Sequence, residues 1–206
     1  MSDQENLLLA VESNPTDDSA WLAYADWLEE QGDPLSRVLR ETLDAGTWSR
    51  CRHELFHKLD RHKRRLLACD CVERLLPYYE SRYPADPRPR QLIETLRRYA
   101  TGKRIAAAKT AVAEACEVAA TDAQRDPGRF LVALRAAQMA YRATEMPSNA
   151  CLNAAYTQAV GCFGPDVVLS TKGPNDSEFK PEWRSAVNAE FRWQVARLLR
   201  DRFGYV

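Results

Sequence analysis

The hydrophobic and polar positions of this 206-residue chain recur with the period of an α-helix along nearly its whole length. Trp21, Tyr24, Ala25 and Leu28 stand at i, i+3, i+4 and i+7, which is the spacing of one buried helical stripe. The pattern predicts helices over 3–12, 18–31 and 34–45, separated by turn and cap residues. Gly46 and Thr47 then mark the end of a small N-terminal module.

The pattern stays helical from residue 48 to 83, with a break expected around Asp60 and a kink at Pro77. Further helices are predicted over 88–100, 103–125, 129–145, 148–162 and 182–202, and residues 164–181 form an irregular stretch. Alanine-rich segments in this part favour close antiparallel packing. The sequence therefore predicts an all-α protein, with a helical module over 1–47 and an antiparallel multi-helix bundle over 48–206.

The composition is that of an ordinary globular protein, with 45% apolar and 28% charged residues. No apolar run is long enough to span a membrane, and the acidic N-terminus lacks the features of a secretory signal. Six sparse, unevenly spaced cysteines do not suit a disulfide scaffold. These features predict a cytoplasmic protein with reduced thiols and no membrane partner.

The net charge of zero hides an asymmetry between the two predicted regions. Residues 1–47 hold eleven acidic side chains against Arg37 and Arg40, whereas residues 48–104 hold fifteen Lys and Arg against seven Asp and Glu. The two faces could complement each other within one fold, or the basic surface could meet an acidic partner. The basic run 61–65, with tyrosines nearby, keeps nucleic acid as an alternative partner.

All three histidines and three of the cysteines lie between Cys51 and Cys71. The spacing of these six residues taken together (Cys51, His53, His57, His62, Cys69 and Cys71) fits no zinc motif. On one helix Cys69 and Cys71 would point about 200° apart, and several cations flank the histidines. A cysteine nucleophile paired with a histidine is an alternative, but apolar helix positions favour cysteines that simply pack in the core. We therefore expect no metal, no cofactor and no catalytic residue, while metal binding by this cluster stays an open alternative.

The segment from Tyr83 to Arg90 holds three prolines and two arginines between two predicted helices. Proline fixes φ and removes a backbone donor, so this loop should be stiff without being helical. Such a loop suits binding a partner better than catalysis. Because Arg and Tyr are frequent interface anchors, the predicted partner-binding residues are Arg88, Arg90, Tyr78, Tyr79 and Tyr83. Alternatively, Arg90 braces the helix that follows.

Two stretches resemble known families. Residues 4–46, with a Tyr24-Ala-Asp-Trp-Leu-Glu-Glu core followed by Gly32-Asp-Pro, resemble the repeat-companion domain that is abundant in planctomycetes. Residues 64–163 are similar to Imm5-like immunity domains of bacterial toxin systems. The second resemblance is carried by Ala68–Pro77, Pro84–Glu94 and Tyr99–Gly102, and alanine-rich helices follow.

These resemblances imply a bacterial protein without enzymatic activity that neutralises or regulates a protein partner, such as a toxin, by stoichiometric binding. A nucleic-acid-associated accessory protein of a defence system is the alternative. The identity of the partner and the oligomeric state stay open.

Overall fold

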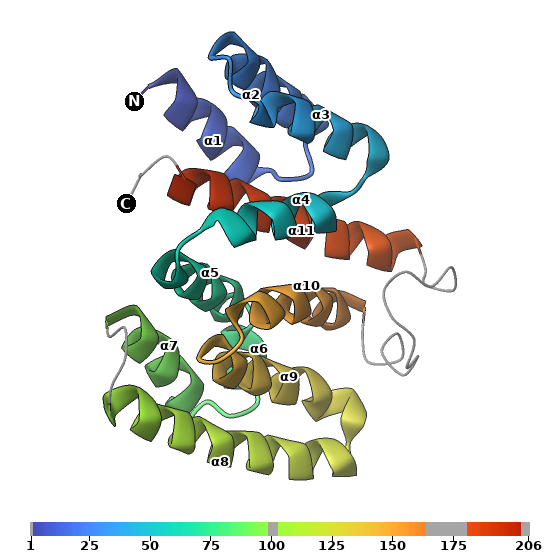
Figure 1. Cartoon of the computed structure of the whole chain (residues 1–206). Helices are drawn as coiled ribbons and strands as arrows, with labels where there is room; N and C mark the ends of the chain where they lie inside the picture. Colours follow the sequence, from blue (N-terminus) through green and yellow to red (C-terminus); the bar gives the residue numbers. More distant parts are fainter. Residues whose placement is uncertain (1, 99–102, 164–180, 203–206) are drawn as a thin grey trace. The chain divides into compact units, whose positions relative to one another are not determined.

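The structure is a computed structural model that describes residues 2–98, 103–163 and 181–202. Eleven α-helices and no strand occur within these ranges, which confirms the all-α prediction (Figure 1). The helices are α1 Asp3–Ser13, α2 Asp18–Glu30, α3 Leu35–Ala45, α4 Trp48–Lys58, α5 Arg61–Glu73, α6 Leu76–Glu80, α7 Arg88–Arg98, α8 Lys103–Arg125, α9 Pro127–Ala143, α10 Pro147–Phe163 and α11 Pro181–Arg202.

The helix limits lie close to those predicted, with one difference in kind. Where a kink was expected at Pro77, α5 ends at Glu73 and the separate short helix α6 begins at Leu76. Pro77 stands in the first turn of α6, where a missing N–H costs nothing because it has no partner inside the helix. The last two residues of the predicted 88–100 helix, Gly102 and most of the irregular stretch 164–181 lie outside the described residues.

The chain divides into two compact units. Unit 1 comprises α1–α4 and the part of α11 from Asn188 onward, and unit 2 runs from Arg61 to Val187. The sequence-based division after residue 47 remains a prediction.

In unit 1 the predicted apolar stripe of α2 is fully buried, and the Trp21 ring lies 4.7 Å from that of Trp48 in α4. Ser2 and Glu5 form a capping box at the start of α1. Gly46 ends α3 with φ of 65°, a left-handed conformation that glycine adopts without strain. Arg200 of α11 bonds to Glu12 of α1 at 2.8 Å, so an ion pair links the first and the last helix within this unit.

In unit 2 the long helices α8 and α9 lie side by side, and α9 also packs on α10 (Figure 1). Small side chains line these contacts: Ala115 and Ala119 of α8, and Ala136 and Ala140 of α9, are buried. Because alanine lets helix backbones approach closely, the alanine-rich pattern explains this packing. Helix α7 packs against α5 and α8 and thereby carries the Tyr83–Arg90 segment to the edge of α8.

Candidate protein-binding site

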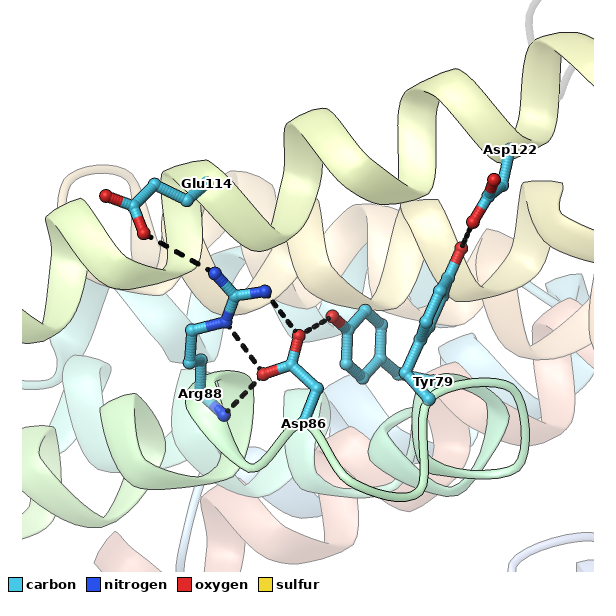
Figure 2. Close-up of polar contacts among 6 residues, drawn as sticks. Tyr79, Asp86, Arg88, Glu114 and Asp122 are labelled. Carbon is cyan, nitrogen blue, oxygen red and sulfur yellow. Dashed lines mark hydrogen bonds and ion pairs between the residues drawn. The ribbon is translucent and has the colours of Figure 1, made fainter.

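The loop between α6 and α7 is held by the carboxylate of Asp86 (Figure 2). Its Oδ1 accepts hydrogen bonds from the backbone N–H of Arg88 at 3.1 Å and from Nε of the same residue at 2.8 Å. Its Oδ2 accepts from Arg88 Nη2 at 2.6 Å and from the Tyr79 hydroxyl at 2.6 Å. Asp86 thus caps the start of α7 and pairs with Arg88 through two parallel bonds, the strongest geometry for such a pair.

Helix α8 holds the same loop at two further points. Arg88 Nη1 lies 3.5 Å from Glu114 Oε2, and the Tyr83 hydroxyl donates a hydrogen bond of 2.8 Å to Asp122 Oδ2. The Tyr83 ring also lies 4.8 Å from the Tyr79 ring, measured between centroids. The loop is therefore tied to α6, α7 and α8, so its stiffness comes from side-chain bonds as well as from proline.

The electrostatics of these groups favour one protonation state. Hydrogen bonds from Arg88 are the main cause that lowers the pKa of Asp86 from 3.8 to about 2, and the bond from Tyr79 adds to this. Burial, followed by the hydrogen bond to Asp122, raises the pKa of Tyr83 from 10.0 to about 12. The pKa of Arg88 is raised chiefly by its bonds to Asp86. At neutral pH the aspartate and arginine are charged and paired, and the phenol is neutral.

Arg90 lies in a second network, on the side of α7 that faces α5 and α6. Its guanidinium bonds to both carboxylate oxygens of Glu80, at 2.6 and 2.9 Å, and lies 3.6 Å from Glu73. Arg97, two turns further on, bonds to Glu73 at 2.6 Å and to Asp70 at 2.7 Å. These ion pairs link three helices, and the contacts of Arg90 match the brace that the sequence left as an alternative.

The five predicted partner-binding residues differ in how far they reach the surface. Tyr79 is fully buried, so its side chain supports the loop from within. Tyr78 and Tyr83 are half-buried, and the side chains of Arg88 and Arg90 are 29% and 39% exposed. The structure brings Tyr79, Tyr83 and Arg88 together at one loop and places Arg90 in the second network. Contact of any of the five with a partner remains a prediction.

The exposed surface of the loop is mostly apolar. A surface depression of about 440 Å³ is lined by residues 83–88, among which Pro84, Ala85 and Pro87 are exposed. Arg88 beneath this surface is paired with Asp86 and Glu114. The loop therefore offers a partner mainly apolar atoms and little net positive charge. Although the segment holds two arginines, its exposed surface is therefore not mainly basic.

Sequence reasoning missed three acidic residues that hold this loop: Asp86, Glu114 and Asp122. Asp86 had a local signal, because an Asp two residues before a helix start is a typical cap. Glu114 lies 26 residues after its partner Arg88, and Asp122 lies 39 residues after its partner Tyr83. Both acidic residues come from another helix, so only the tertiary structure reveals their role.

The six Cys and His residues do not converge. Cys51, Cys69 and Cys71 are buried, whereas His53, His57 and His62 are exposed. Within the described residues no group of three or more potential ligands is placed to hold a metal ion. Burial raises the pKa of Cys51 to about 11 and that of Cys69 to about 12, so neither thiol supplies a thiolate nucleophile at neutral pH.

One metal-binding spacing lies within this cluster, contrary to the expectation that no such motif is present. Residues 53–57 read His-Glu-Leu-Phe-His and so satisfy the H-E-x-x-H spacing. Both histidines lie on the exposed face of α4, and their Nε2 atoms are 3.1 Å apart.

The comparisons with known proteins give one match. The family model described as "Imm-5 like putative immunity protein" matches residues 54–201, a longer stretch than the 64–163 recognised from the sequence. Searches of curated proteins and of solved structures returned no match. The repeat-companion resemblance of residues 4–46 stays a prediction, since the family match begins after it. Among the described residues no helix is long and apolar enough to cross a membrane. Because the matched segment covers more than half of the chain, the protein belongs to the Imm-5 like immunity protein family.

Proposed function

We propose that this protein binds a partner protein, such as a toxin, in a fixed ratio and blocks its activity by covering its functional surface. Membership of an immunity-type family supports this role and supports a function without catalysis. The five described cysteines that are free thiols fit action in the reducing cytoplasm.

The observation that carries the proposal is the Tyr83–Arg88 loop, which is fixed before any partner arrives. A loop held by Asp86, Arg88 and two tyrosine hydroxyls loses little conformational entropy on binding, and such preorganisation strengthens an interface. In this proposal Pro84, Ala85 and Pro87 form the contact surface with Tyr83 and Tyr78, while Tyr79 and Arg88 position the loop. Arg90 contributes its exposed edge and braces α7.

The role as a whole is tested by co-expression with each toxin-like protein encoded next to the gene of this chain. We expect growth to be restored and the two purified proteins to form a complex of fixed stoichiometry. Toxicity that persists beside well-folded protein, together with no complex in size-exclusion chromatography, would contradict the proposal.

The place of the loop in the interface is tested with Ala85→Glu, which puts a bulky charge on the exposed surface without touching the Asp86 network. Ala107→Glu makes the same change on the exposed side of α8 and serves as the matched control. We expect the first variant to weaken partner binding by at least about tenfold and the second to leave it unchanged. Equal affinities for both variants would remove the loop from the interface.

A second pair of variants tests whether Arg88 and Arg90 contribute to partner binding. The double variant Arg88→Ala/Arg90→Ala should also weaken binding, because it loosens the loop and removes two interface candidates. Arg37→Ala, which removes an exposed arginine paired with Glu41, is the control. An unchanged set of partners for the double variant would show that neither arginine contributes.

A further inference from the structure

The exposed face of α4 carries a pair of histidines in a geometry suited to a metal ion. His53 and His57 stand one turn apart, their ring centroids are 4.3 Å apart, and their Nε2 atoms are 3.1 Å apart. The opposite face of the helix is fixed by the buried side chains of Cys51, Leu55 and Phe56. The burial of that face sets the rotation of α4 and keeps both imidazoles at the surface.

The distance between the two nitrogens is close to what one tetrahedral ion would impose. With Zn–N bonds of about 2.0–2.1 Å and tetrahedral angles, two imidazole nitrogens lie roughly 3.3 Å apart. The observed separation, at which the two rings share a hydrogen bond, differs from this by a few tenths of an ångström. A metal ion bound by both nitrogens would replace that hydrogen bond. Imidazole nitrogen is also a preferred ligand of Zn²⁺, Cu²⁺ and Ni²⁺.

The charges around the pair are less unfavourable than the sequence indicates. The buried guanidinium of Arg52 lies over the Phe191 ring at 5.6 Å, on the face of α4 away from the histidines. Arg50 is paired with Glu54, whose Oε1 accepts from Arg50 Nε at 3.0 Å. Lys58, directly after His57, and Arg61, at the start of α5, are exposed cations that stay close to the pair in sequence.

From this geometry we propose that His53 and His57 bind one Zn²⁺ or similar transition-metal ion through their Nε2 atoms, with water in the other coordination positions. The site is not that of a metalloprotease. Such enzymes use a third protein ligand, and the described residues bring none to the pair. Glu54, at the position of the general base in H-E-x-x-H, is held by Arg50 instead. The proposal is independent of the partner-binding loop, which lies in unit 2.

The test is a Zn²⁺ titration of the full chain under reducing conditions, followed by isothermal calorimetry and by NMR of ¹⁵N-labelled histidine side chains. We expect one equivalent of Zn²⁺ to shift the Nε2 signals of two of the three histidines. His53→Gln and His57→Gln should each weaken Zn²⁺ binding by at least about tenfold. Removing a residue that only supports a metal ligand already costs about that much, and these two residues are the ligands themselves.

Two matched variants complete the test. His62→Gln removes the third exposed histidine, and Glu54→Gln removes the motif carboxylate, and we expect both to bind Zn²⁺ like the wild type. All four positions are exposed, so circular dichroism should show unchanged helix content. The proposal is overturned if His53→Gln and His57→Gln retain wild-type affinity, or if His62→Gln loses as much as either.

Discussion

The hydrogen-bond network at Asp86 can be tested by the single substitution Asp86→Asn. Asparagine keeps the size of the side chain but removes its charge and turns one acceptor into a donor. In one orientation of the amide that donor faces Arg88 Nη2 and the Tyr79 hydroxyl, and in the other it faces the backbone N–H and Nε of Arg88. All four groups donate to Asp86 in the native protein. One or more of these part-buried groups would then lose its partner, and the ion pair with Arg88 would be lost.

The size of the effect follows both from the pKa shift of Asp86 and from the cost of removing a hydrogen-bond partner. Each tenfold change in proton affinity corresponds to about 1.4 kcal/mol, so lowering the pKa of Asp86 from 3.8 to about 2 stabilises the folded state by about 2 kcal/mol. The carboxylate side chain is 17% exposed, which leaves limited screening by solvent. Removing a hydrogen-bond partner of a charged group costs about 1.5–3 kcal/mol in mutational series. We expect Asp86→Asn to destabilise the protein by about 2 kcal/mol at neutral pH.

The sign of the pH dependence follows from the direction of the pKa shift. Because the folded-state pKa of Asp86 is below its unfolded value, the stabilisation is present above pH 3.8 and is lost as the pH falls through about 2. Asparagine does not titrate. The difference in stability between wild type and Asp86→Asn should therefore shrink as the solution is acidified.

Urea denaturation followed by far-UV circular dichroism, at about pH 7 and about pH 3, measures both effects. Glu41→Gln is the control, since it breaks the exposed pair of Arg37 and Glu41 and should cost less than about 0.5 kcal/mol. An Asp86→Asn cost as small as that of the control at neutral pH, or a difference that grows on acidification, would refute the role assigned to Asp86.

Three further results are expected. In the native protein Cys51 and Cys69 should resist iodoacetamide at about pH 8 and react once urea is added, as followed by peptide mass spectrometry, because both thiols are buried and their pKa values are raised to about 11 and 12. Gly46→Ala should cost about 1 kcal/mol in urea denaturation and Gly46→Asn less, because the left-handed backbone alone opposes a side chain and nothing lies within 4 Å of an added Cβ. Generic DNA and RNA should show no binding at about 50 mM salt in a fluorescence-anisotropy titration, whereas tight binding that falls steeply with salt would favour the nucleic-acid alternative.

The fold was readily predicted because its signals are local. The stripe of Trp21, Tyr24, Ala25 and Leu28 repeats every turn and is fully buried, and Gly46 and Asp17 act at the helix ends as their residue types indicate. The division near Pro77 was harder, since a proline is compatible both with a kink within a helix and with the first turn of a new one.

The candidate site was predicted only in part. The sequence drew attention to the Tyr83–Arg90 loop, whose contact with a partner stays a prediction. It could not show that Arg88 pairs with Asp86 and Glu114, because the second of these comes from another helix. Tyr79 was chosen as a contact for its residue type, and its burial depends on how α6 packs against α9. The spacing of His53 and His57 in α4, by contrast, is visible in the sequence alone, because both residues lie within about one helical turn.

Two different sets of residues hold the loop in place and form its exposed surface. Tyr79, Asp86 and Arg88 constrain one another, so a change in one calls for a matching change in the others. Pro84 and Ala85 take no part in those bonds and lie exposed above them. In the proposed role, a change in the partner's surface calls for a change in the exposed positions of the loop. This arrangement would let the displayed positions diversify while the support beneath them, and the fold, stay the same.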